Sequence, residues 1–129
     1  MNPGMHDQDL LFYRRICLDP KPGDIVIIDI PERNKRIVKR VIAASGQTVT
    51  VDREGHISLD GAALQETYAK YGEALRRYDT RFPFTVPDGE LFVLGDNRVI
   101  SLDSRYVELG TVDKSQIVGK VLFIFHPFH

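Results

Sequence analysis

The sequence is short of cysteine, of long apolar runs and of net charge, and each shortage excludes a class of protein. Its single cysteine, Cys17, excludes an internal disulfide framework and a cysteine-based zinc site. Its apolar runs are short, such as residues 121–125, whereas a membrane-spanning helix needs about 20 apolar residues. Seventeen Lys and Arg stand against eighteen Asp and Glu, so the chain lacks the basic field of a non-specific nucleic-acid binder. We therefore expect one domain over residues 1–129 that neither binds nucleic acid nor contains a membrane span.

What the sequence does contain is a series of short β-branched and aromatic runs separated by glycine and proline. Such runs predict strands, and they lie at residues 10–16, 25–28, 36–42, 48–51, 57–59, 91–94 and 117–125. Residues 62–78 differ, because apolar and aromatic side chains from Leu64 to Tyr78 recur at spacings of three and four and predict a short helix. The pattern indicates a mainly antiparallel β fold with at most one short helix.

Lys39 is unusual because period-two alternation places it on the same strand face as Ile37 and Val41. Two interpretations are open. The face is solvated, or the lysine stem lies on apolar surface with its ammonium in water. Alternatively, Lys39 is desolvated, held neutral and used as a general base. Its pKa of about 10.4 must then fall by roughly 3, at a cost of about 4 kcal/mol.

Residues 95–105 place two aspartates, two arginines and two serines in one loop between strands. One interpretation is a turn held together by Asp–Arg ion pairs. The other is a rigid platform that holds a hydroxyl against a catalytic group, since bidentate Arg–carboxylate pairs have a fixed geometry. The loop alone does not decide between them.

Four features occur in a fixed order along the chain: Pro3, Gly-Asp-Ile-Val at 23–26, Lys-Arg-Val-Ile at 39–42, and Gly-Asp-Asn-Arg…Ser…Asp-Ser-Arg at 95–105. Their order and residue identities resemble those of the type I signal peptidases, which are membrane-anchored serine–lysine proteases that cleave signal peptides from exported proteins. The resemblance covers essentially the whole chain. The hairpin turn at 60–61 and the approach at 84–89 are similar to the small Gram-positive-type members.

The resemblance implies a role for each matching residue. Lys39 is the general base that removes the proton of a serine hydroxyl, and Ser101 is the hydroxyl that orients the lysine amine. Four residues brace the site without reacting: Asp96, Arg98, Asp103 and Arg105. A lysine base needs no histidine, and no metal or other cofactor is implied.

The family's nucleophile motif, Ser-Met-x-Pro, matches Met1-Asn2-Pro3 from its methionine onward, so the serine would fall immediately before Met1. Three explanations are open: the chain was cut after an anchor and the serine, the natural serine lies upstream, or another residue stands there in a non-proteolytic relative. We favour the cut. In each case we expect the chain as given to be inactive.

Family members bind an extended signal peptide by strand addition, and shallow pockets select alanine-like side chains. The strand at 36–39, with Ile37 and Val38, would form one wall of the groove. Met1, Met5 and Val38 match positions that line the small-residue pocket, although plain core packing would explain them equally well. The implied partners are signal peptides and the membrane surface, with the catalytic domain on the extracytoplasmic side.

Two other functions remain open from the sequence. A non-proteolytic relative would act as a chaperone for exported or pilus-type subunits, and the residue before Met1 would identify it. A self-cleaving repressor-type serine–lysine protease is the other. The Gly-Asp-Asn-Arg motif and the lack of a basic helix-turn-helix segment argue against it.

Overall fold

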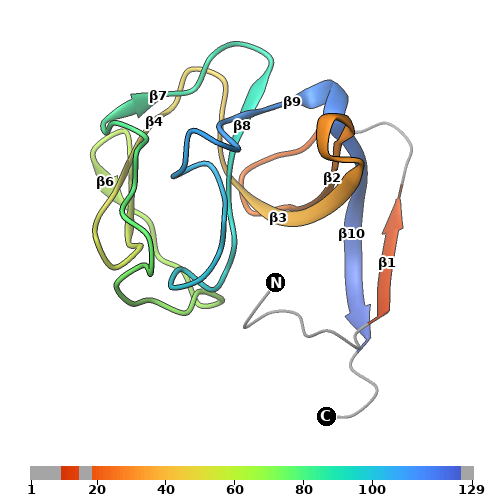
Figure 1. The fold of residues 1–129 in the computed structure, drawn as a ribbon, viewed down its shortest axis with the longest axis horizontal. Helices are drawn as coiled ribbons and strands as arrows, with labels where there is room; N and C mark the ends of the chain where they lie inside the picture. Colours follow the sequence, from red (N-terminus) through yellow and green to blue (C-terminus); the bar gives the residue numbers. More distant parts are fainter. Residues whose placement is uncertain (1–9, 15–18, 126–129) are drawn as a thin grey trace.

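The computed structural model describes residues 10–14 and 19–125, which form two antiparallel sheets (Figure 1). The larger sheet has six strands in the order β1 (Leu10–Arg14), β10 (Ile117–Phe125), β2 (Ile25–Ile30), β3 (Lys35–Ala44), β8 (Glu90–Leu94) and β9 (Val112–Asp113). The smaller sheet has four, in the order β6 (Ala62–Ala63), β5 (Ile57–Leu59), β4 (Thr48–Val51) and β7 (Phe84–Thr85). Two single 3₁₀ turns, η1 (Pro31–Arg33) and η2 (Lys114–Gln116), complete the described elements.

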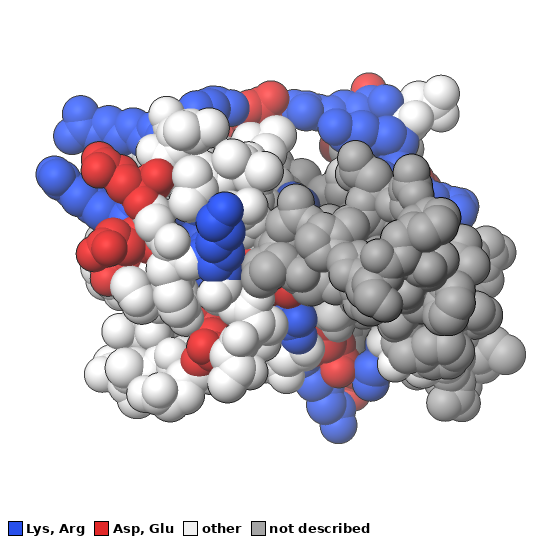
Figure 2. All heavy atoms as spheres, turned by 90° about the horizontal axis from the view of Figure 1, so that it is seen from below, with Lys and Arg blue, Asp and Glu red and all other residues white. Residues whose placement is uncertain are grey.

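The prediction of a mainly antiparallel β fold is confirmed. Each predicted strand corresponds to an observed one. β2 and β3 extend beyond the predicted ranges, and β1 is described only to Arg14. No helix in the described ranges has the length and apolar character needed to cross a bilayer. Side chains of both charges occur on the face shown in Figure 2.

The prediction of a short helix over residues 62–78 is wrong. Ala62 and Ala63 form β6, and the backbone that follows bonds to other segments instead of to itself. Lys70 N–H donates to the Asp96 carbonyl at 2.7 Å, and Gly72 N–H donates to the Glu54 carbonyl at 2.9 Å. Because these long-range bonds replace the helical ones, the spacing of the aromatic residues does not produce a helix.

Strand β3 of the larger sheet also packs against the smaller sheet. It pairs with β2 along Lys35–Arg40 and with β8 from Arg40 onward, and its register shifts between Val41 and Ala43. Val41 packs in one apolar cluster with residues of β2 and β8, whereas Ile42 packs in a second cluster with residues of the smaller sheet. The strand is therefore buried on both faces at its C-terminal half, and the segment just before that half carries Lys39.

Candidate active site

Lys39 and Ser101 meet although 62 positions separate them in the chain. Lys39 lies opposite Val26 in the sheet, on the strand face that it shares with Ile37 and Val41. Its Nζ donates a hydrogen bond to Ser101 Oγ at 2.8 Å. The lysine side chain is thus directed at a hydroxyl on the loop after β8, and half-buried rather than solvated.

The surroundings of Lys39 hold its pKa below the ordinary value for lysine. Burial is the main cause, because desolvation disfavours the ammonium form. Asp103, and less strongly Asp96, raise the pKa, whereas Arg105 and Lys35 lower it. The balance favours a neutral amine at a lower pH than a solvated lysine would need, which is what a lysine base requires.

Gly95 lies directly against this pair. A Cβ at this position would be 2.0 Å from Ser101 Oγ and 3.5 Å from Lys39 Nζ. Only glycine lets the backbone approach the hydroxyl so closely. Its N–H donates to Asp103 Oδ2 at 3.1 Å, and Ser101 N–H donates to the Asn97 carbonyl at 3.1 Å. The position of the hydroxyl is therefore set by backbone on both sides.

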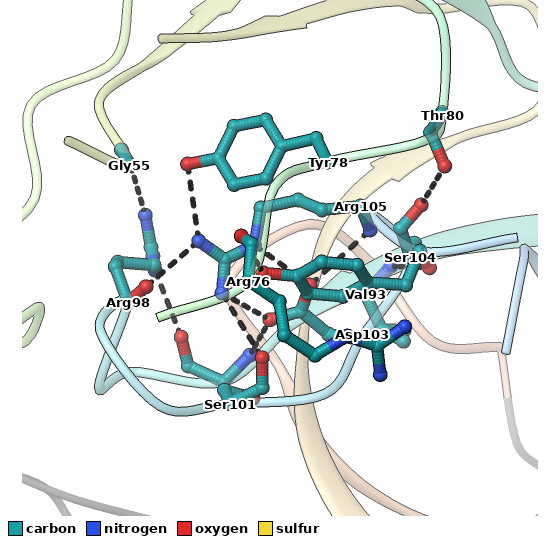
Figure 3. A network of polar contacts seen from close by, with 12 residues as sticks. Gly55, Arg76, Tyr78, Thr80, Val93, Arg98, Ser101, Asp103, Ser104 and Arg105 are labelled. Carbon is teal, nitrogen blue, oxygen red and sulfur yellow. Dashed lines mark hydrogen bonds and ion pairs between the residues drawn. The ribbon is translucent and has the colours of Figure 1, made fainter. Parts of the chain in front are cut away.

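Asp103 and Arg105 form a buried bidentate ion pair that holds the loop together (Figure 3). Arg105 Nε donates to Asp103 Oδ1 at 2.8 Å and Nη2 donates to Oδ2 at 3.0 Å. The guanidinium also donates to the backbone carbonyls of Arg98 and Ser101, at 2.9 and 3.3 Å. One side chain thus fixes three points of the loop, including the residue that carries the hydroxyl.

The other two charged residues of the loop are paired with partners outside it. Asp96 accepts two hydrogen bonds from Arg40, from Nε and Nη2, both at 2.9 Å. Arg98 pairs with Glu66, and the side chains of both are fully buried. The interpretation of the loop as a turn held together by its own ion pairs therefore holds for Asp103–Arg105 alone. Neither Arg40 nor Glu66 was predicted from the sequence as a site residue, and nothing in the sequence pointed to the contact at Gly95.

The substrate-binding predictions fall partly outside the described residues, since Met1 and Met5 lie before Leu10. Ile37 and Val38 are half-buried neighbours on β3 and face opposite sides of the strand. A cavity of about 120 Å³ lies beside Lys39, and Ile37 and Leu102 are among the residues that line it. Arg33 and Lys35 also line it.

The site is built from a lysine, hydroxyls and arginine–carboxylate pairs. No cluster of three or more potential metal-ligating side chains occurs among the residues that the structure describes. The arrangement places a partly desolvated amine next to a fixed hydroxyl in a buried polar network. Such an arrangement can accept a proton from a nucleophile and return it to a leaving group.

Comparison with known proteins identifies the family. The family model described as signal peptidase, peptidase S26, matches residues 1–126. A signal peptidase I from Bacillus licheniformis is 39% identical over 138 aligned positions that cover 100% of this chain and 73% of the relative. Signal peptidase I T from Bacillus subtilis strain 168 is 34% identical and is covered over 70% of its length.

A solved structure agrees with the sequence comparisons. The crystal structure of a signal peptidase I from Enterococcus faecalis V583 aligns with a TM-score of 0.62 at 31% identity. The alignment covers 81% of this chain and 97% of that one. The resemblance found in the sequence motifs is thus confirmed in sequence and in fold, and the chain belongs to the signal peptidase family, peptidase S26.

Proposed function

We propose that this domain removes signal peptides from exported proteins by a serine–lysine mechanism, with Lys39 as the general base and Ser101 as the hydroxyl that orients it. The observation that carries the proposal is the 2.8 Å hydrogen bond between Lys39 Nζ and Ser101 Oγ, at a lysine whose pKa is lowered by burial. Family membership supplies the reaction class, and the nucleophile is a serine placed immediately before Met1.

In this mechanism the serine hydroxyl attacks the carbonyl carbon of the scissile peptide bond while the neutral Lys39 amine takes its proton. The lysine then donates that proton to the leaving amine, which leaves an ester between the serine and the signal peptide. Water attacks the ester in the second half-reaction, again with Lys39 as the base. Asp96, Arg98, Asp103 and Arg105 hold the loop and do not react.

The substrate is an extended segment with small side chains one and three residues before the cleaved bond, added as a strand beside residues 36–39. Ile37 and Val38 contribute to this wall, and Val38 also lines the small-residue pocket together with Met1 and Met5. We propose that the enzyme works at the membrane surface, on the extracytoplasmic side, and that an anchor outside these residues holds it there.

The test adds a serine before Met1 and measures cleavage of an Ala-x-Ala signal peptide in detergent or lipid. We expect cleavage by the serine-bearing protein and none by the 129-residue chain. In the serine-bearing protein, Lys39→Ala should reduce kcat by about three orders of magnitude or more, because it removes an essential base. Lys120→Ala is the matched control, since Lys120 forms a surface pair with Asp24.

The pH dependence gives a second readout. Because the pKa of Lys39 lies below the ordinary lysine value, kcat should rise with pH and level off at a lower pH than a solvated lysine would require. The proposal is wrong if the serine-bearing protein is inert and Lys39→Ala makes no further difference, or if the Lys39→Ala protein cleaves as fast as the Lys120→Ala control.

A further inference from the structure

Glu66 lies outside the four features that carry the family resemblance, yet it is the carboxylate partner of Arg98. Its Oε1 accepts a hydrogen bond from Arg98 Nη1 at 3.0 Å, and its Oε2 accepts one from Nη2 at 2.7 Å. Both side chains are 0% exposed. A buried bidentate pair has a fixed geometry, so Glu66 determines where the Arg98 guanidinium lies.

Two tyrosine hydroxyls complete the surroundings of the Glu66 carboxylate. Tyr68 donates to Oε2 at 2.5 Å and Tyr71 donates to Oε1 at 2.9 Å. Burial opposes ionisation, but the hydrogen bonds from Arg98 and the tyrosines outweigh it and hold the pKa of Glu66 below its ordinary value. Burial and the same contact raise the pKa of Tyr71 to about 12. The carboxylate is therefore charged, and both tyrosines remain donors, at neutral pH.

Arg98 connects this cluster to the lysine–serine pair. Its Nε donates to the Gly95 carbonyl at 2.8 Å, and its Nη1 also donates to the Gly55 carbonyl at 2.7 Å. Gly95 is the residue whose backbone lies against Ser101 Oγ. A displacement of the guanidinium would therefore be transmitted through one carbonyl to the hydroxyl that Lys39 contacts.

A second connection runs through Tyr68. Its ring lies beneath the Arg40 guanidinium, which is 3.7 Å from the ring centroid and holds Asp96 in a bidentate pair. The backbone joins the same two segments, because Lys70 N–H donates to the Asp96 carbonyl and Arg98 N–H donates to the Lys70 carbonyl. Residues 66–70 thus hold residues 95–98 by side chains and by backbone.

We propose that Glu66 is a positioning residue that holds Gly95 through Arg98, and Asp96 through Tyr68 and Arg40, and thereby keeps Ser101 against the Lys39 amine. The expected effect on kcat rests on the proposed function, whereas the expected change in the surroundings of Lys39 does not. The two are therefore tested separately.

The first test titrates the Lys39 amine in the 129-residue chain and monitors the titration by NMR of the labelled lysine side chain. Lys35 faces Lys39 from the same strand, and the loop contributes Asp96, Asp103 and Arg105. Glu66→Gln leaves the charge of each of these groups unchanged. Loss of a negative charge can by itself only lower the pKa of a lysine.

We expect the pKa of Lys39 to rise in Glu66→Gln by roughly 0.5 or more, because a relaxed Gly95 lets water reach the amine. Because the pKa of Lys39 can rise only if the backbone at Gly95 moves, an unchanged or lower pKa in the folded variant overturns the proposal. Glu108→Gln is the matched control, since Glu108 pairs with Arg33 and Arg76 at the surface, and it should leave the titration unchanged.

The second test uses the serine-bearing protein. Glu66→Gln should lower kcat about 10- to 100-fold, leave KM for the signal peptide nearly unchanged, and move the rise of kcat to higher pH. If Glu66→Gln does not fold, Tyr68→Phe decides, because it keeps the ring beneath Arg40 and removes only the hydroxyl. It should shift the Lys39 pKa in the same direction by a smaller amount, and no shift overturns the proposal.

The two proposals fail in different ways. If the pKa of Lys39 rises in Glu66→Gln but the serine-bearing parent cleaves nothing, the role of Glu66 is supported and the proposed function is contradicted. Normal cleavage by a folded Glu66→Gln protein with an unchanged Lys39 titration contradicts the role of Glu66 alone.

Discussion

Gly95→Ala is the most direct perturbation of the lysine–serine pair. The added Cβ would lie 2.0 Å from Ser101 Oγ and 2.5 Å from Ser101 Cβ. Carbon atoms pack at about 3.5–4.0 Å, so Ser101 must move by about 1 Å or more. The φ of Gly95 is outside the left-handed region, so the substitution strains no backbone torsion and its effect comes from this contact.

The displacement should break or lengthen the 2.8 Å hydrogen bond to Lys39. A misplacement of about 1 Å at a catalytic group reduces the rate about 100-fold, and we expect a loss of kcat of this size in the serine-bearing protein. Overpacking should also reduce the free energy of unfolding by about 1–3 kcal/mol, which thermal or urea denaturation would measure.

Gly61→Ala separates the two effects. A Cβ at Gly61 meets nothing within 4 Å, but its φ of +86° disfavours alanine by about 1–2 kcal/mol. This control should lose a comparable free energy of unfolding and keep its kcat. A Gly95→Ala protein with kcat within about twofold of the parent would refute the reasoning, since the hydroxyl would then tolerate displacement.

Two further predictions concern stability. Arg105→Ala leaves the buried Asp103 carboxylate without its partner and should cost roughly 3–5 kcal/mol, a fall in Tm of about 10–20 °C. Arg33→Ala, at a half-exposed pair, is the comparison, and a similar fall in both variants would contradict the prediction. Because the pKa of Glu66 is lowered, its ionisation stabilises the fold above its ordinary pKa and is lost as the pH falls through the lowered value. Melts between about pH 6 and 3 should therefore show a smaller acid loss of Tm for Glu66→Gln than for the parent. Equal losses of Tm in the two proteins would show that the ionisation of Glu66 does not cause the acid sensitivity.

Local sequence patterns predicted the strands well because their causes are local. The β-branched run at 25–28 and the alternation at 36–42 match β2 and β3, and the turns between strands lie at glycines such as Gly23, Gly55 and Gly89, which have positive φ. The helix predicted for 62–78 failed for the opposite reason. Its backbone bonds to Glu54, Asp96 and Val99, partners that no window of neighbouring residues contains.

By itself, the sequence determined the strand pattern, the strand face on which Lys39 lies and, through its motifs, the family. Each depends on spacing along the chain, where residues two apart on a strand share a face. The family resemblance implied that Ser101 meets Lys39, but only the tertiary structure decided that Arg40 meets Asp96 and Glu66 meets Arg98. These partners lie 62, 56 and 32 positions apart, so their contact depends on the pairing of strands and the path of the loops. Burial, which lowers the pKa of Lys39, likewise exists only once that packing has formed.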